Sequence, residues 1–318
     1  DLAVQLSCEP PDREKESTES RDTSNNDKVR GDKNLGGQER KFVEGDPSYA
    51  PGRVGKAYAF DGRRYVDCGN VADFGYYDKF TVSAWIKRDG ESDGVLCSRM
   101  IDEPDGNGWN VQIVGGKLQV NLVTRWLDDA LRAETVANVP ANQWTHVALT
   151  YDGSRLASGV KLFVNGQEQQ QRVLVDLLYQ TFQSKEPFRL GAHGPAGRFH
   201  GCIDDVRIYR ARLEPTEIEL LATAATPAEI LALPVANRTP QQSRKLQAYF
   251  IERHADETIR SAHEAVSALR RQHEQVIDRI PTTMVMQESP ERRDTFVLLR
   301  GRYDQPGEKV APELPKFV

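Results

Sequence analysis

The sequence lacks long hydrophobic runs and a large excess of either charge. No stretch approaches the roughly 18 uncharged apolar residues that a membrane span needs, and the most apolar segment, residues 220–236, contains prolines and Glu229. The formal net charge of −5 gives no basic surface for nucleic acid. With 318 residues, 38% of them hydrophobic, the chain has room for two domains, or for one large β domain with an appendage.

Cysteine is also scarce, and the four cysteines are far apart: Cys8, Cys68, Cys97 and Cys202. This spacing does not fit a zinc site, and none of them begins a C-x-x-C-H haem attachment motif, so we expect no haem site. We expect buried free thiols in strands, or a Cys8–Cys202 disulfide if the first and last strands pair. The chain begins at Asp1 and ends at PELPKFV, which we interpret as a fragment of a longer protein.

Residues 9–34 have no aromatic side chain and one large aliphatic, Val29. Such a segment buries too little apolar surface to offset its ordering entropy, so we expect a mobile polar loop after a first strand at residues 2–8. The next segments read as short strands joined by turns, with hairpin signals at Gly115-Gly116 and Asn165-Gly166. The expected strands are 56–60, 64–68, 79–87, 94–98, 109–114, 117–123, 143–153, 159–169, 187–192 and 199–209. Along residues 79–87, Phe80, Val82, Ala84 and Ile86 alternate with Thr81, Ser83, Trp85 and Lys87, the period of two of a strand with unlike faces. The succession of strands predicts an antiparallel sandwich.

After residue 214 the pattern becomes helical. Residues 214–224 predict a short helix, and Thr239-Pro240-Gln241-Gln242 forms a capping box that opens a helix to about His254. A heptad seam follows, with spacings alternating between three and four, which predicts a helix of about 25 residues in a helical hairpin or short coiled coil. Its positions are Ile259, Ala262, Val266, Leu269, His273, Val276 and Ile280, and His273 is a polar interruption of the apolar stripe. Pro281 ends the helix, and residues 283–288 and 295–301 are expected to return to strands.

Two adjacent acids, Asp204 and Asp205, lie in the expected last strand. Neighbouring strand residues face opposite ways unless the backbone bulges, so we expect Asp204 on the side of Val206 and Ile208, and Asp205 beside Arg207. The two carboxylates then cannot converge on a glycosidic bond. Asp204, near the core, is expected either to accept hydrogen bonds or to bind Ca²⁺.

The segment TRWLDDALRAE, residues 124–134, is expected to be a loop between two strands. It carries Trp126, Asp128, Asp129 and Arg132, an aromatic with flanking polar groups. These residues could hold a sugar ring or a neighbouring domain, or the loop could simply pack down its own tryptophan.

Five stretches together resemble the laminin-G-like, concanavalin A-like jelly-roll domains, over about residues 50–221: GRVGKAYAFDGRRYVDCGN, FTVSAWIKRDG, NQWTHVALTYDG, VKLFVNG and FHGCIDDVRIYRARLEPTEIELL. The resemblance implies two antiparallel sheets packed face to face and a binding role, with glycan or protein as ligand. The E-x-D-x-x-E run of the glycosidase branch does not occur. Some relatives bind Ca²⁺ through an acid near this last strand, and Asp204 is the matching position.

Three stretches of the tail carry a second likeness: RTPQQSRKLQAYF, the heptad helix, and PTTMVMQESPERRDTFVLLRGRYDQPGEKV. Together they resemble the start of the C-terminal domain of unknown function of Planctomycete cytochrome C-type proteins. The likeness implies an extracytoplasmic protein, periplasmic or at the cell surface, in which sister domains are partners.

The expected organisation is therefore mainly β, a jelly-roll sandwich followed by an α-helical hairpin. Residues 1–49 form a first strand and polar loop of the sandwich, 50–214 the jelly roll, 215–280 the helical segment, and 281–318 the truncated start of a C-terminal domain. The expected function is non-catalytic recognition, with a structural spacer or a glycoside hydrolase as alternatives.

Overall fold

The structure is a computed structural model, which describes residues 2–6, 41–101, 106–193, 197–280, 294–302 and 305–311. The chain divides into two compact units, residues 1–254 and 255–318. The first unit contains the β-structure and three helices, and the second contains one long helix and a small hairpin.

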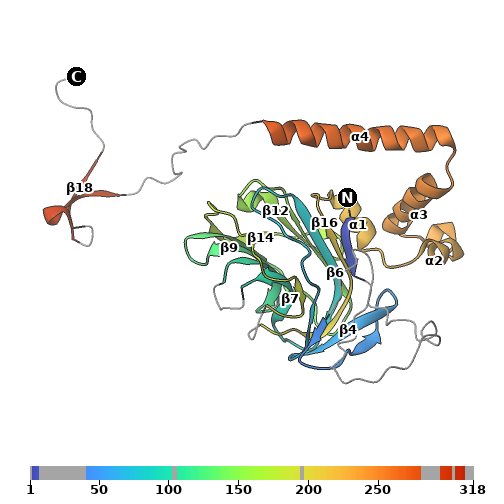
Figure 1. Ribbon diagram of the computed structural model, residues 1–318. Coiled ribbons are helices and arrows are strands. Elements are labelled where there is room, and N and C mark those ends of the chain that lie inside the picture. The colour runs from blue at the N-terminus through green and yellow to red at the C-terminus, as the bar shows by residue number, and fades with distance from the viewer. Residues whose placement is uncertain are drawn as a thin grey trace, which may run out of the picture. The chain divides into compact units, whose positions relative to one another are not determined.

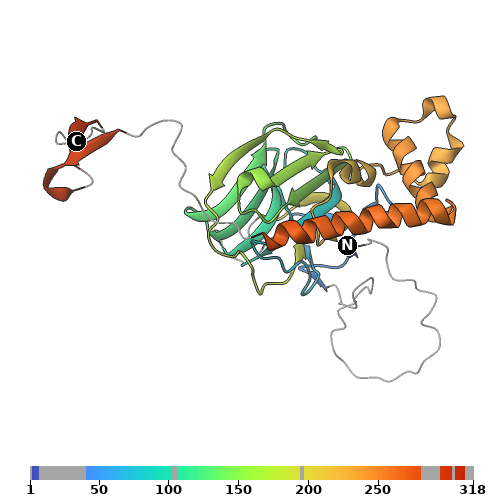
Figure 2. The same cartoon turned by 90° about the horizontal axis from the view of Figure 1, so that it is seen from above.

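Two eight-stranded antiparallel sheets lie face to face as two layers of the first unit (Figures 1 and 2), which confirms the predicted sandwich. The first sheet has the order β13 (Gln167–Glu168), β12 (Val160–Val164), β11 (Thr145–Tyr151), β6 (Phe80–Arg88), β16 (His200–Tyr209), β4 (Lys56–Asp61) and β3 (Tyr49–Pro51), and β1 (Leu2–Leu6) pairs with β16. The second has the order β14 (Gln171–Asp176), β10 (Asp129–Thr135), β9 (Lys117–Arg125), β8 (Gly108–Val114), β7 (Gly94–Met100), β15 (Arg189–Leu190), β5 (Tyr65–Asp67) and β2 (Lys41–Val43).

The core lies between the inner faces of the two sheets. Successive side chains of a strand point to opposite faces, so every second residue of each strand points into this core. On β6 the inward residues are the four that the alternation predicts, Phe80, Val82, Ala84 and Ile86. The second sheet supplies Trp109, Val111, Ile113, Leu118, Val120 and Leu122, all buried.

Both predicted hairpin turns are present. Gly115 and Gly116 join β8 to β9 with φ of 55° and 77°, and Asn165 and Gly166 join β12 to β13 with φ of 50° and 80°. Two successive residues at positive φ match the twist of the flanking strands, which is why these residue types occupy the turns.

The second sheet has strands that the sequence did not predict. Residues 124–134 were expected to form a loop, but residues 129–135 are strand β10, with Leu131 and Ala133 in the core. That prediction was wrong because the charged residues that alternate with them, Arg132 and Glu134, lie on the other face and disguise the pattern. β14, which pairs with β10, was also missed.

The first and last strands do pair, with Val4 opposite Ile208 and Leu6 opposite Val206. Cys68 and Cys97 are buried, as expected, and Cys202 is partly buried. Cys8 and the predicted polar loop lie outside the described residues, so the Cys8–Cys202 disulfide stays a prediction.

Three helices follow the last strand: α1 (Pro215–Leu221), α2 (Pro227–Ala232) and α3 (Pro240–Arg253). α1 packs its buried Ile218 against Ala148 and Phe163 on the outer face of the first sheet. The predicted capping box of α3 is confirmed, because Thr239 accepts the Gln242 N–H and the Gln242 side chain accepts the Thr239 N–H. α2 was not predicted.

The second unit contains α4 (Glu257–Arg279) and the hairpin of β17 (Thr295–Leu298) and β18 (Pro306–Val310). The predicted long helix is confirmed, and its apolar stripe is largely exposed, from 45% at Ile259 to 64% at Leu269. The predicted strand at residues 283–288 lies outside the described residues. Among the described helices none is long and apolar enough to cross a membrane.

Candidate functional site

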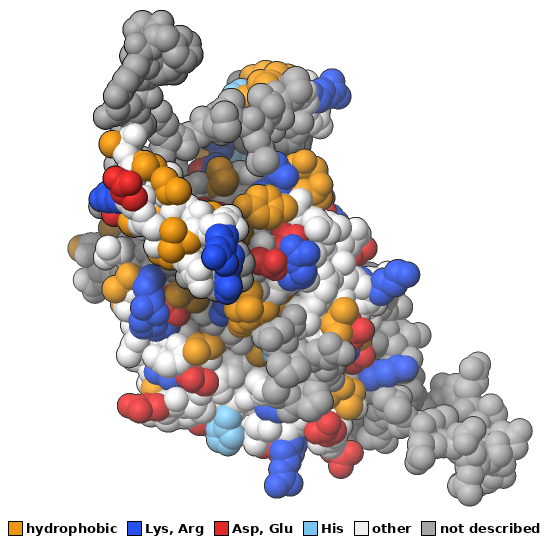
Figure 3. All heavy atoms as spheres, turned by 90° about the vertical axis from the view of Figure 1, so that its left-hand side faces the viewer, with side chains coloured by type: hydrophobic (Ala, Val, Ile, Leu, Met, Phe, Trp, Pro, Cys, Tyr) orange, Lys and Arg blue, Asp and Glu red, His pale blue; other side chains and the backbone are white. Residues whose placement is uncertain are grey.

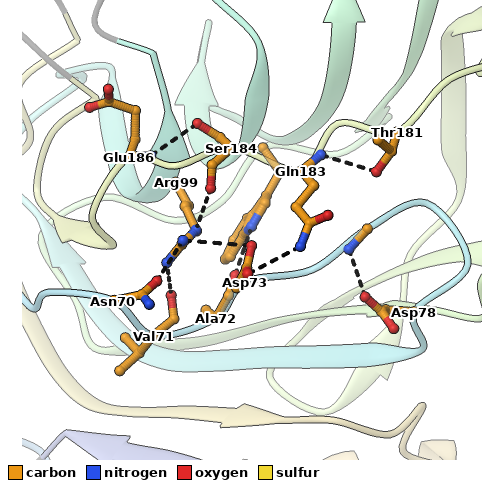
Figure 4. Close-up of polar contacts among 12 residues, drawn as sticks. Asn70, Val71, Ala72, Asp73, Asp78, Arg99, Thr181, Gln183, Ser184 and Glu186 are labelled. Atoms are coloured by element: carbon orange, nitrogen blue, oxygen red, sulfur yellow. Dashed lines mark hydrogen bonds and ion pairs between the residues drawn. The ribbon is translucent and has the colours of Figure 1, made fainter.

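A polar pocket of about 440 Å³ opens where three segments of the sandwich meet. Its lining residues come from the β5–β6 loop (Asn70, Asp73), the end of β7 (Arg99) and the β14–β15 loop (Gln183, Ser184, Lys185). We call it the rim pocket. Figure 4 shows how backbone and side-chain groups of two loops surround Arg99.

Arg99 forms the floor of the rim pocket, and its side chain is only 3% exposed. Its guanidinium donates to the Ser184 carbonyl (3.1 Å), the Val71 carbonyl (2.7 Å) and the Asn70 side-chain oxygen (2.7 Å) (Figure 4). Burial lowers the pKa of Arg99, but an arginine side chain stays charged in proteins. One buried cation therefore fixes the two loops relative to each other.

Asp73 and Gln183 connect the two loops above Arg99. The Gln183 amide donates to Asp73 Oδ2 at 3.1 Å, and Asp73 Oδ1 lies 3.6 Å from the Arg99 guanidinium (Figure 4). Beneath them, the indole N–H of Trp109 donates to the Ala72 carbonyl at 3.3 Å. Both loops are thus hydrogen-bonded to the sandwich, so the pocket is largely preformed.

Sequence reasoning missed the rim pocket because its residues are scattered over more than 100 positions and no motif joins them. Arg99 was the one available signal, a charged residue at the end of a strand whose other residues are buried.

The predicted ligand residues Trp126 and Arg132 lie together on the outer face of the second sheet. The Arg132 guanidinium lies 3.7 Å from the centroid of the Trp126 ring, and Trp126 packs against Met100, Val123 and Ala130. This arrangement favours the second alternative, a tryptophan packed down by its own surroundings. Ligand binding by the pair stays a prediction.

The two acids predicted beside them lie in different surroundings. Asp128 is exposed and pairs with Arg125 at 2.9 Å. Asp129 is fully buried, and its Oδ1 accepts the N–H groups of Tyr179 (2.8 Å) and Gln180 (3.2 Å). Asp129 therefore anchors the β14–β15 loop and is not accessible to a ligand.

A row of buried polar side chains continues from Arg132 across the second sheet. Arg132 donates to Asn121 (3.1 Å), and Asn121 donates to Asn110 (2.7 Å). Asn110 and Asn121 are 1% and 0% exposed. Their hydrogen bonds are made within the row, as buried amides require, so we assign the row a structural role.

The twin aspartates do not follow the simple alternation that the sequence predicts. Asp204 pairs with Trp85 and Arg207 with Ser83, so Asp205 and Val206 together stand opposite Ala84. This is a β-bulge, and Asp205 has the positive φ of 45° that such a bulge uses. The placement of Asp204 with Val206 and Ile208 was therefore wrong: it lies on the outer face with Trp85, and Ile203, Val206 and Ile208 face the core.

The two carboxylates also have separate partners. Asp204 is 1% exposed and accepts the Val54 N–H at 2.7 Å, which holds the turn between β3 and β4. Burial raises the pKa of Asp204, although hydrogen bonds from the Val54 and Arg53 backbone act against the shift. Asp205 pairs with Arg207 at 2.9 Å. The expected hydrogen-bonding role of Asp204 is present.

The described residues contain no group of three or more His, Cys, Asp or Glu side chains that could hold a metal ion. Asp204 has Asp205 beside it, but that carboxylate pairs with a cation. The donor set at Asp204 therefore does not fit a protein-built Ca²⁺ cage, which needs six to eight oxygens.

Acidic and basic side chains are interspersed on the face drawn in Figure 3, with hydrophobic side chains between them. This mixed pattern is consistent with the small net charge.

Several solved structures resemble this chain in fold. Domain 4 of AbnA, a GH43 extracellular arabinanase from Geobacillus stearothermophilus, in complex with arabinotriose, is 20% identical with a TM-score of 0.42, and the match covers 59% of this chain and 90% of that one. The binding domain of Paraclostridial Mosquitocidal Protein 1 is 17% identical with a TM-score of 0.45, covering 59% and 48%. The Ruminococcus gnavus IT-sialidase CBM40 bound to alpha2,3 sialyllactose is 19% identical with a TM-score of 0.38, covering 46% and 83%.

No curated protein matches the chain. The family model of the concanavalin A-like lectin/glucanases superfamily, Laminin_G_3, matches residues 60–219, which is half of the chain and contains most strands of both sheets. This agrees with the resemblance seen in the sequence motifs. The chain therefore belongs to the concanavalin A-like lectin/glucanases superfamily, through a laminin-G-type domain at residues 60–219.

Proposed function

We propose that this domain is a non-catalytic recognition module that binds carbohydrate in the rim pocket. The observation that carries the proposal is a preformed polar pocket of about 440 Å³ whose two loops are fixed by one buried arginine, Arg99. Its volume lies in the range of about 300–1,000 Å³ that is usual for small-molecule sites.

The chemistry of the lining suits sugar hydroxyls, which donate and accept hydrogen bonds at once. The Gln183 side-chain oxygen and Asp73 offer acceptors, and Lys185 offers a donor. Because Arg99 already fixes the loops, binding does not have to order them, which reduces the entropic cost of association.

The lining argues against glycoside hydrolysis. That reaction needs two carboxyl groups about 5–9.5 Å apart across the scissile bond, and Asp73 is the one carboxylate among the lining residues of the rim pocket. Asp204 and Asp205 do not supply a pair, because the first holds a backbone turn and the second holds Arg207.

A glycan array and affinity gels, followed by calorimetry with the best binder, test the proposal. Asp73→Asn and Gln183→Ala should each weaken binding at least about tenfold, the equivalent of about 1.4 kcal/mol. Glu91→Gln and Gln170→Ala change exposed residues outside the pocket and should bind as the native chain does. Undiminished binding by the pocket variants, or release of sugar from polysaccharide by the pure protein, would overturn it.

The setting of the module is a further part of the proposal. The tail resemblance supports an extracytoplasmic, cytochrome c-linked multidomain protein whose haem chemistry resides outside this chain. The complete coding sequence tests this directly. An export signal and upstream C-x-x-C-H motifs are expected, and an open reading frame without them would refute the proposed link to cytochrome c domains.

A second function, contact with sister domains, is favoured by the exposed apolar stripe of α4. Five of its positions are 45–64% exposed: Ile259, Val266, Leu269, Val276 and Ile280. Such a stripe in water is typical of a helix that packs against a partner. Protection of these positions from hydrogen exchange in the longer protein, but not in this chain, is the expected result.

A further inference from the structure

We propose that the rim pocket continues onto an aromatic platform made by Tyr77, so that the ligand is an oligosaccharide and not a single sugar. The inference rests on the proposed carbohydrate binding and adds a second subsite to it. The platform is defined here by Tyr76, Tyr77 and Arg155.

Tyr77 is an exposed aromatic on the same loop as the pocket. Its residue is 62% exposed, and its ring lies beside that of Tyr76 with 4.2 Å between centroids and 31° between planes. The neighbour thus holds the exposed ring in place while leaving much of it open to a ligand.

Arg155, in the loop between β11 and β12, contacts both Tyr76 and Tyr77. Its guanidinium lies 5.6 Å from the Tyr76 ring centroid and 5.3 Å from that of Tyr77, within the range of cation–π attraction. The backbone N–H of Arg155 donates to the hydroxyl of the buried Tyr151 (3.0 Å), and this hydroxyl donates to the backbone carbonyl of Tyr76 (2.7 Å).

The backbone at this point is held in an uncommon conformation. Arg155 has a φ of 63°, a left-handed conformation that is unfavourable for a residue with a side chain and clusters at ligand sites. Gly153 permits the approach of the two loops, because a Cβ there would lie 2.4 Å from the Tyr77 carbonyl oxygen. These contacts hold the backbone that carries the exposed Tyr77 ring. The ring is therefore already in position before a ligand binds.

The loop that carries Tyr77 passes close to the β14–β15 loop that lines the rim pocket. The Gly75 N–H donates to the Asp78 carboxylate (2.7 Å) and closes the turn that carries Tyr77. A Cβ at Gly75 would lie 3.2 Å from Thr181 Oγ1, and that oxygen accepts the N–H of Gln183 at 3.2 Å (Figure 4). Asp73 and Tyr77 are four positions apart, a span of at most about 14 Å.

The platform selects a ligand by the chemistry of its face. One side of a pyranose or furanose ring presents C–H groups, which stack on an aromatic ring as other apolar surfaces do, whereas its hydroxyls need polar partners. The rim pocket supplies the polar partners and Tyr77 supplies the apolar surface. An oligosaccharide can occupy both the rim pocket and the Tyr77 platform, whereas a monosaccharide can occupy only one of them.

Calorimetry with the mono-, di- and trisaccharides of the arabinose, xylose, glucose and mannose series tests the inference. In the series that binds, the trisaccharide should bind at least about tenfold more tightly than the monosaccharide. Tyr77→Ala should remove about tenfold from the trisaccharide affinity, about 1.4 kcal/mol, and leave the monosaccharide unchanged. Tyr77→Phe keeps the ring and should bind normally, as should Phe250→Ala, which removes another exposed aromatic, from α3.

The possible failures are distinguishable. If Asp73→Asn loses binding but Tyr77→Ala keeps the full preference for the trisaccharide, the platform is refuted and the pocket stands. Equal affinity for mono- and trisaccharide refutes the platform in the same way. If no sugar in the panel binds the native chain, the proposed function fails and the platform fails with it.

Discussion

Replacing Asp204 tests the link between the β-bulge and the stability of the sandwich. Asp204→Ala removes the acceptor of the Val54 N–H and of the Arg53 backbone hydrogen bond. An orphaned backbone N–H costs about 1–3 kcal/mol when buried, but Arg53 and Val54 are exposed and water can replace part of each bond. We therefore expect a loss of about 2 kcal/mol in the free energy of unfolding, or about 4–8 °C in Tm for a domain of this size.

The pH dependence gives the sharper result. Because burial raises the pKa of Asp204 above its ordinary value of 3.8, the folded chain holds this proton more tightly than the unfolded chain. The stabilising contribution is then complete below pH 3.8 and declines as the pH rises through the folded pKa. Asp204→Ala should therefore lower the free energy of unfolding more at pH 4 than at pH 8. The free energy of unfolding of Asp204→Asn should lie between those of the native chain and Asp204→Ala.

Urea unfolding followed by tryptophan fluorescence at both pH values measures the difference. Asp128→Ala is the control, because its ion pair with Arg125 is 60–67% exposed and should change stability by less than about 1 kcal/mol. A larger loss at pH 8 than at pH 4 would show that the carboxylate is stabilised by its hydrogen bonds more than it is penalised by burial, and the reasoning would be refuted.

Three further predictions concern the other site residues. Asp129→Ala should lower the free energy of unfolding by about 2–4 kcal/mol, because two backbone N–H groups lose their acceptor; faster proteolysis within residues 177–185 should accompany it, and an unchanged cleavage pattern would contradict the anchoring role. Trp126→Ala should cost about 2 kcal/mol through lost packing and leave glycan binding unchanged, whereas selective loss of binding would establish the ligand role predicted from the sequence. If Asp204 is a Ca²⁺ ligand, excess calcium should raise Tm relative to chelator by mass action; our expectation from the donor set is identical melting curves.

The strands and helices were predictable where their signal is local. The alternation in β6 placed Phe80 to Ile86 correctly because inward and outward positions are fixed by the pleat of a single strand. The Thr239 capping box and the Asn165-Gly166 turn were likewise readable, since each involves residues within four positions of one another.

β10 and the bulge at Asp205 were not predictable from local pattern. Charged Arg132 and Glu134 sit on the outer face of β10, where Trp126, Asn121, Lys117 and Arg172 satisfy them. Their partners come from β9, β14 and the β9–β10 turn, so the segment resembled a loop in the sequence. The bulge depends on pairing with β6, and the sequence around Asp205 reads equally well as a regular strand.

The sequence alone determined the family, the sandwich and the order of its hairpins, because hydrophobic periodicity and turn chemistry act over a few residues. Only the tertiary structure decided the candidate site. Arg99, Asp73 and Gln183 meet because two loops distant in sequence close over the end of β7, and Asp129 is buried because one of those loops folds onto it. Convergence of this kind follows from the pairing of whole strands, which no short stretch of residues contains.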